Sequence, residues 1–152
     1  MALTGKLSIE APIQTPPAKY FNVFITQFHN FQNICSRIPE AKIHEGDNWH
    51  VTHAVKNWTL IVDGKPVKLK EKMEKIDKEN KSVTYKFFDG DLSKNYKVFN
   101  VFLQVIEKND GSASCKISVD YEKINENVEA PYGFMEFFDK SIKDIDSHLL
   151  KA

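Results

Sequence analysis

The spacing of hydrophobic residues changes in stages along this chain. Over residues 3–13, apolar side chains occupy alternate positions, which predicts a β-strand. After Pro16 and Pro17, apolar residues recur at intervals of three and four as far as Ile34, which predicts one broken helix or two short helices. These helices should end before Pro39, because the residue before a proline disfavours the helical conformation.

Beyond this point the sequence predicts a series of strands joined by short turns. Turn-forming residues gather at 45–48, 63–66, 78–81, 89–91 and 109–111, and the segments between them are rich in Val, Ile, Thr, Tyr and Phe. Since most of these loops have hairpin length, we expect an antiparallel meander. The predicted strands are a short one near 42–44 and longer ones at 50–62, 67–76, 82–88, 96–107 and 113–123.

A long helix is predicted after Pro131. Its apolar residues, from Phe134 to Leu149, follow one another at intervals of 4, 4, 3 and 4, which places them on one helical face. A helix of about 20 residues is about 30 Å long and can cross a small sheet. For a chain of 152 residues, these elements predict a single α+β domain over residues 1–152.

Composition narrows the class of protein. The 21 basic and 21 acidic side chains balance, which argues against a nucleic-acid partner because phosphate binding normally requires a basic excess. We find no secretion signal and no apolar segment of membrane-spanning length, and Cys35 and Cys115 are isolated. We therefore expect a cytoplasmic protein with reduced, buried cysteines and no membrane partner. The 11 Phe rings either fill a core or surround a site for an apolar molecule.

Alternation within the predicted strands indicates which side chains face the interior. Two charged residues, Lys56 and Glu71, share the apolar faces. Burial lowers the pKa of a lysine and raises that of a carboxyl, so both groups become candidates for acid–base catalysis; a structural ion pair is the alternative. The apolar residues on these inward faces are Trp58, Leu60, Val62, Val67, Leu69, Met73, Val83, Tyr85, Phe87, Cys115, Ile117, Val119 and Tyr121.

Several short motifs follow one another in a specific order: Leu3-Thr4-Gly5-Lys6-Leu7, Glu45-Gly46 with Trp49, Val62-Asp63-Gly64-Lys65, Asp89-Gly90-Asp91-Leu92 with Tyr96-Lys97, and Tyr121-Glu122-Lys123. Each motif alone is weak, but their order and spacing extend over nearly the whole chain. Together they resemble the Bet v 1 superfamily of plant proteins, and specifically its major latex protein-like branch, which is related to the pathogenesis-related class 10 proteins. The resemblance implies the helix-grip (START-like) fold, in which a curved seven-stranded antiparallel sheet and two short helices surround a long C-terminal helix and a large apolar cavity.

The resemblance also implies a function. Members of the superfamily bind hydrophobic plant metabolites such as terpenoids, steroids or hormones, some in connection with plant defence, and a minority are enzymes of specialised metabolism. No cofactor or metal is expected. The ligand-binding residues that the pattern and the resemblance predict are Phe24, Lys56, Trp58, Leu69, Glu71, Met73, Tyr85, Phe87, Val98, Asn100, Phe102, Ile117, Val119, Phe134, Phe138 and Ile142.

One predicted strand, 96–107, is apolar on both faces, so its pattern does not decide which face is buried. The resemblance places Val98, Asn100, Phe102 and Gln104 inside. This register would leave Phe99, Val101, Leu103 and Val105 outside, and an exposed apolar stripe of that kind suggests a homodimer. Coverage of the stripe by neighbouring long side chains is the alternative.

The sequence departs from the superfamily at one loop. Later glycines of the loop after the second strand are replaced by His50 and His53, so we expect a stiffer loop without the phosphate-binding or ribonuclease role given to some relatives. With His44 these residues could face a zinc ion, but no acidic or thiol spacing completes a zinc pattern. We also find no nucleophile motif of a serine hydrolase.

Two functional hypotheses remain open from the sequence. The first is a binding protein that holds an apolar metabolite mainly by burial, with residues 125–128 and Gly133 as a gate. The second is a cofactor-free cyclase or isomerase that steers a reactive intermediate of iridoid or alkaloid type by shape and orientation.

Overall fold

The computed structural model describes residues 3–45 and 48–151 of the chain. The helices are α1 (Pro17–Thr26), α2 (Phe31–Ile34) and α3 (Tyr132–Lys151), with short 3-10 turns η1 (Phe28–Asn30) and η2 (Gly90–Lys94). The strands are β1 (Thr4–Ile13), β2 (Glu40–Glu45), β3 (Val55–Val62), β4 (Lys65–Asp77), β5 (Ser82–Phe88), β6 (Tyr96–Glu107) and β7 (Ala113–Lys123).

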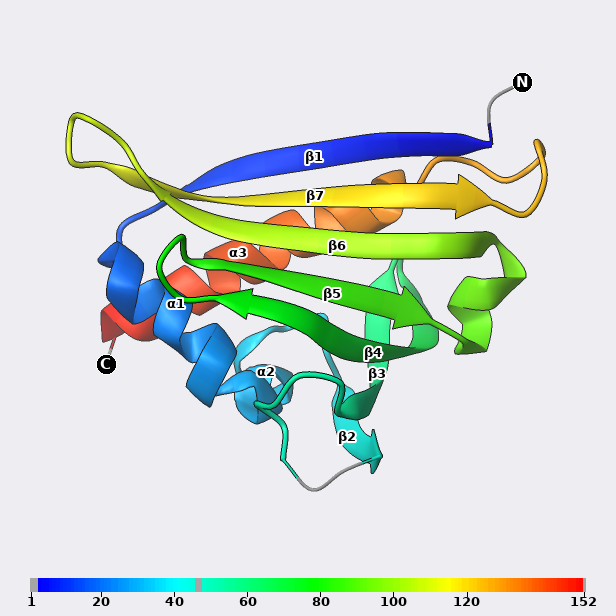
Figure 1. Ribbon diagram of the computed structural model, residues 1–152, viewed down its shortest axis with the longest axis horizontal. Helices are drawn as coiled ribbons and strands as arrows, with labels where there is room; N and C mark the ends of the chain where they lie inside the picture. Colours follow the sequence, from blue (N-terminus) through cyan, green and yellow to red (C-terminus); the bar gives the residue numbers. More distant parts are fainter. Residues whose placement is uncertain (1–2, 46–47, 152) are drawn as a thin grey trace.

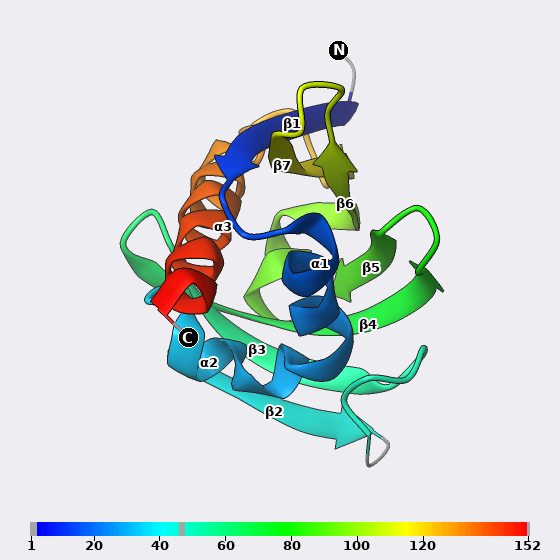
Figure 2. The ribbon, with the colours of Figure 1, turned by 90° about the vertical axis from the view of Figure 1, so that its left-hand side faces the viewer.

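All seven strands form one antiparallel sheet in the order β1-β7-β6-β5-β4-β3-β2, which confirms the predicted fold class (Figure 1). The first strand joins the last along its whole length, with Thr4 opposite Glu122 and Ile13 opposite Ala113. Figure 2 shows the sheet curving around its concave side, which α3 spans, and it shows α1 and α2 near the C-terminal end of α3. The interior therefore lies between the concave face of the sheet and the three helices.

Polar contacts near the C-terminal end of α3 attach this helix to α1 and to the segment between β1 and α1. The Asp146 carboxylate accepts hydrogen bonds from the backbone N–H groups of Gln14 and Thr15 and from the Thr15 hydroxyl, at 2.6 to 3.2 Å. The Tyr20 hydroxyl donates to the Ile142 carbonyl oxygen at 3.0 Å. These contacts fix the helix across the open side of the sheet. Among the helices of the described residues, none has the length and apolarity needed to cross a membrane.

The strand predicted at 50–62 is shorter in the structure, because residues 49–53 form turns and β3 begins at Val55. His53 takes a left-handed backbone conformation (φ 69°), and its N–H donates to the Met73 carbonyl oxygen at 2.8 Å. A position where the resemblance expects glycine therefore keeps a glycine-like conformation despite its side chain. The turn predicted at 45–48 includes Gly46 and Asp47, which lie outside the described residues.

The predicted register of β6 is wrong. Phe99, Val101, Leu103 and Val105 point inward and are at most 4% exposed, whereas Val98 and Phe102 are 38% and 41% exposed. The reason is the pairing of β6 with its neighbours: Val101 lies opposite Tyr85 on β5 and Val119 on β7, and residues directly opposite in an antiparallel pair share one face of the sheet.

This correction removes Val98, Asn100 and Phe102 from the candidate ligand contacts. It also removes the basis of the predicted homodimer, since the apolar stripe expected on the outer face is part of the core. Phe102 stands on the outer surface between Thr84 and Ser118 of the neighbouring strands.

Candidate functional site

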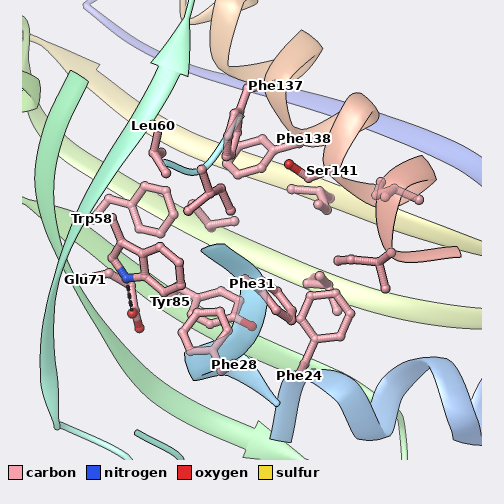
Figure 3. Close-up of a pocket in the computed structure, with 17 residues that line it drawn as sticks. Phe24, Phe28, Phe31, Trp58, Leu60, Glu71, Tyr85, Phe137, Phe138 and Ser141 are labelled. Atoms are coloured by element: carbon pink, nitrogen blue, oxygen red, sulfur yellow. Dashed lines mark hydrogen bonds between the residues drawn. The ribbon is translucent and has the colours of Figure 1, made fainter. Parts of the chain in front are cut away.

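A small cavity of about 70 Å³ lies in the interior, between the concave face of the sheet and the helices (Figure 3). Rings from α1, η1 and α2 form one side, strands β3 to β7 form another, and α3 closes the third. The residues that line it are Phe24, Phe28, Phe31, Ile38, Trp58, Leu60, Glu71, Tyr85, Phe87, Val101, Leu103, Ile117, Phe137, Phe138, Ser141, Ile142 and Ile145.

The cavity is much smaller than the large one that the resemblance implies, because aromatic rings fill the interior. The Phe28 ring centroid lies 5.0 Å from that of Phe31, 4.8 Å from that of Trp58 and 5.6 Å from that of Tyr85. An engineered cavity of about 150 Å³ is known to hold benzene, so about 70 Å³ holds less than one such ring. A metabolite of terpenoid size can enter only if side chains move.

A second, wider basin of about 730 Å³ opens at the end of the sheet where α3 begins. It is lined by the β3–β4 turn, η2 and the segment between β7 and α3, including Asn125, Asn127, Val128 and Gly133 of the predicted gate. The basin carries both polar and apolar side chains, in contrast to the aromatic inner cavity.

Four phenylalanine rings, which we call the ring stack, lie between the inner cavity and the basin. Phe87 and Phe138 line the cavity, with ring centroids 6.2 Å apart, and Phe134 lines the basin. Phe99 connects the two sides, since its ring lies 5.7 Å from Phe87 and 4.8 Å from Phe134. The ring stack therefore forms a continuous series of aromatic contacts from the cavity to the basin.

The two predicted catalytic candidates form a buried ion pair. Lys56 Nζ lies 3.3 Å from Glu71 Oε2, and both side chains are at most 1% exposed. The opposite oxygen, Oε1, accepts the indole N–H of Trp58 at 2.9 Å. Lys56 also donates to the Trp49 carbonyl oxygen at 3.3 Å, and its Nζ lies 4.9 Å above the Phe28 ring. The lysine is thus enclosed by partners, and it does not line the cavity.

Burial controls the ionisation of this pair. It raises the pKa of Glu71 to about 7, and the nearby Lys56 and the Trp58 N–H oppose this rise only in part. Burial also lowers the pKa of Lys56, which the charge of Glu71 partly offsets. An ionised Glu71 without a positive partner would be very unfavourable in this position, so the carboxylate depends on Lys56.

The raised pKa of Glu71 predicts a specific dependence of stability on pH. Between pH 4.5 and about pH 7 the folded protein holds a proton on Glu71 that the unfolded chain releases. The free energy of unfolding, relative to that of Glu71→Gln, should therefore be highest below pH 4.5 and should fall by about 2–3 kcal/mol as pH rises through about 7. Urea unfolding of both proteins at pH 4.5, 6 and 8 measures this difference; a constant difference would contradict it.

Three buried polar side-chain atoms of the described residues accept or donate no hydrogen bond: Glu71 Oε2, the Tyr85 hydroxyl and Ser141 Oγ. The first of these, Glu71 Oε2, has only the ion pair with Lys56 Nζ at 3.3 Å. All three residues line the inner cavity. Glu71 and Ser141 belong to opposite walls, β4 and α3, as Figure 3 shows, and the weakly polar Cys35 thiol lies beside Ser141. Buried polar groups are nearly always hydrogen-bonded, so these three atoms give an otherwise apolar cavity unused hydrogen-bonding capacity.

The structure brings half of the predicted ligand-binding residues to the cavity wall. Leu69, Met73 and Val119 face inward as predicted but pack in the core, and Phe134 lines the basin. Lys56 lies behind the wall, and Val98, Asn100 and Phe102 belong to the outer face. The predicted residues that line the cavity are Phe24, Trp58, Glu71, Tyr85, Phe87, Ile117, Phe138 and Ile142.

Sequence reasoning missed several lining residues, and most of them carried a usable signal. Phe28 and Phe31 continue the helical spacing after Phe24, and Ile145 continues that of α3. Leu60 lies on the predicted inward face of β3, and the lining by Val101 and Leu103 follows from the corrected register. Phe137 and Ser141 flank the predicted helix face, so a wider face would have included them, whereas Ile38 lies in a loop without a periodic pattern.

His50 contacts two residues of η1, Phe28 and His29. His50 Nε2 accepts the backbone N–H of Phe28 at 3.2 Å and lies 3.4 Å from His29 Nδ1. Burial, and then the neighbouring His29 and Lys56, lower the pKa of His50. Within the described parts of the chain, no group of three or more His, Cys, Asp or Glu side chains is placed to hold a metal ion.

Comparison with known proteins gives a consistent picture over the whole length. The sequence model of the Pathogenesis-related protein Bet v 1 family matches residues 2–152. MLP-like protein 328 of Arabidopsis thaliana is 34% identical over 153 residues, which cover 100% of both chains. Major latex protein 146 of Papaver somniferum is 32% identical over 97% of this chain and 92% of its own.

A solved structure shows the same architecture. The crystal structure of ginseng major latex-like protein 151 from Panax ginseng matches with a TM-score of 0.89 and 32% sequence identity. The match covers 97% of this chain and 98% of that chain. These similarities confirm the resemblance that the order of short sequence motifs predicts.

Proposed function

Because this chain belongs to the Pathogenesis-related protein Bet v 1 family, whose members bind hydrophobic ligands, we propose that it binds an apolar small molecule in the inner cavity. The observation that carries the proposal is the coincidence of an aromatic cavity with three unsatisfied polar atoms around it. A mainly apolar wall with a few convergent polar groups is the usual composition of a small-molecule site.

Affinity would come mainly from burial of apolar area, at roughly 25 cal/mol per Å² removed from water. Since the cavity is small, the ligand would take space now occupied by rings. Movement of the ring stack toward the basin would enlarge the cavity and open a path for the ligand. The basin, bordered by Asn125, Asn127, Val128 and Gly133, would then be the entrance.

We place this binding in the cytoplasm, and we propose specialised metabolism or plant defence as its setting. The cysteines support a reducing compartment, because Cys35 and Cys115 are free and buried. Burial raises the pKa of each thiol to about 12, so neither is activated for chemistry.

The proposal predicts that filling the cavity from α3 blocks binding. Ser141→Leu adds apolar volume to the wall and removes an unsatisfied hydroxyl, so the fold should be retained while space for a ligand is lost. Titration with the neutral fluorescent probe N-phenyl-1-naphthylamine should show an affinity at least about tenfold lower than that of the unmodified protein, which corresponds to about 1.4 kcal/mol.

Lys143→Leu is the matched control, because Lys143 lies on the same helix and its side chain is 62% exposed. This variant should bind the probe like the unmodified protein. Equal probe affinity in Ser141→Leu and Lys143→Leu would show that the probe binds elsewhere. If neither the unmodified protein nor either variant shows saturable binding of the probe, ligand binding is refuted. Mass spectrometry of an organic extract of freshly purified protein would then identify any retained molecule.

A further inference from the structure

We propose, on the basis of the proposed function, that the ligand is a neutral apolar molecule carrying a hydroxyl group, and that the cavity discriminates against carboxylates. Two features carry this inference: the sign of the charge at the wall, and the hydrogen-bonding capacity of the unsatisfied atoms.

Glu71 is the only charged residue among those that line the cavity in the described structure. Trp58 occupies one of its oxygens, and the second, Oε2, forms the ion pair with Lys56 at 3.3 Å but accepts no hydrogen bond. An ionised carboxylate can only accept hydrogen bonds, so the group it lacks is a donor. A ligand hydroxyl supplies such a donor without adding charge.

The positive charge of Lys56 is not available to a ligand. Its Nζ is held by Glu71 Oε2 and the Trp49 carbonyl oxygen, each at 3.3 Å, and the ring of Phe28, a lining residue, covers it. An anionic ligand entering the cavity would therefore meet the carboxylate before the ammonium. Like charges at short range in a medium of low dielectric constant repel strongly, so the wall disfavours anions.

The remaining unsatisfied atoms suit a hydroxyl as well. The Tyr85 hydroxyl and Ser141 Oγ are neutral groups that both donate and accept hydrogen bonds. A ligand hydroxyl can therefore donate to Glu71 or accept from Tyr85, whereas a pure hydrocarbon leaves all three atoms unsatisfied. Unpaired buried polar groups make a site reject the analogue that lacks the matching polar atom.

Three ligands with one acyclic carbon framework test this ranking: geraniol (hydroxyl), myrcene (hydrocarbon) and geranate (carboxylate). Each should be measured at pH 8, where Glu71 is ionised, by displacement of N-phenyl-1-naphthylamine. We expect geraniol to bind about fivefold more tightly than myrcene and at least tenfold more tightly than geranate.

Burial of any carboxylate is unfavourable, so the contribution of Glu71 is isolated by Glu71→Gln, which keeps an acceptor for Trp58 but removes the charge. In this variant the preference for geraniol over geranate should shrink by at least about threefold. Tyr85→Phe, which removes only the hydroxyl, should lower the affinity for geraniol and leave the affinity for myrcene unchanged. This variant provides the test if Glu71→Gln does not fold.

The outcomes separate this inference from the proposed function. If the probe and all three ligands fail to bind, the proposed function is wrong. If they bind but the affinity for geranate equals that for geraniol, the cavity binds apolar molecules without the proposed selectivity. The same conclusion follows if neither substitution changes the order of the three affinities.

Discussion

Replacing Lys56 by methionine is expected to lower the free energy of unfolding by about 3–5 kcal/mol at pH 8, one of the largest effects of any single substitution in this protein. The methionine retains most of the apolar volume of the lysine stem, so the loss is mainly electrostatic. It leaves the Glu71 carboxylate buried without its cation, because the remaining hydrogen bond, from Trp58, does not replace a full positive charge. Urea unfolding followed by circular dichroism measures the effect.

Two controls distinguish the ion pair from general disruption of the core. The double variant Lys56→Met, Glu71→Gln removes both charges and keeps an acceptor for the Trp58 N–H, so it should recover most of the lost free energy. Lys68→Met changes an exposed lysine of the neighbouring strand and should lower the free energy of unfolding by less than about 0.5 kcal/mol. A double variant as unstable as Lys56→Met alone would show that the pair is not coupled.

Replacing Phe99 by alanine should lower the free energy of unfolding by a similar amount, about 3–5 kcal/mol. Phe99 is 1% exposed, and its ring packs against Phe87, Tyr96 and Phe134. Its removal leaves a void at the centre of the ring stack, where the surrounding strands cannot collapse to fill the space. The same void should widen the path between basin and cavity, so a neutral fluorescent probe should associate faster. Denaturant unfolding and stopped-flow fluorescence measure the two effects.

Phe102→Ala is the matched control for this prediction, because Phe102 lies three positions further along the same strand and is 41% exposed. We expect it to lower the free energy of unfolding by less than about 1 kcal/mol and to leave the rate of probe association unchanged. The comparison also tests the register of β6: if Phe102→Ala were the more destabilising change, Phe102 and not Phe99 would face the interior.

The sequence was sufficient to predict the fold because its local signals agree with one another. Alternation in β3, β4, β5 and β7, glycine at the turns 63–66 and 109–111, and the four-residue spacing in α3 all predict the elements that form. The register of β6 was the exception, since a strand with two apolar faces contains no local signal. Counting back from the 109–111 turn would have placed Val105 opposite Cys115, and hence on the inner face.

The site was less predictable than the fold, and for a different reason. Alternation correctly placed Lys56 and Glu71 on the inner face, but it could not show that the lysine turns away from the cavity toward Trp49 and Phe28. The size of the cavity was also beyond the sequence. Whether a ring lines a hollow or fills it depends on how Phe28 packs against its neighbours from other elements, and periodicity within one element contains no information on this.

The pairing of the first strand with the last affects how the protein is made. Ile13 must find Ala113, and Thr4 must find Glu122, so roughly a hundred or more residues separate the partners. On the ribosome β1 emerges early, but its partner is synthesised only after the whole meander has appeared. Until then β1 has no partner strand, and the β1–β7 pairing is the last to form in the sheet. Contacts this distant in sequence slow folding, so closure of the sheet by β1 should be a late step that follows release of most of the chain.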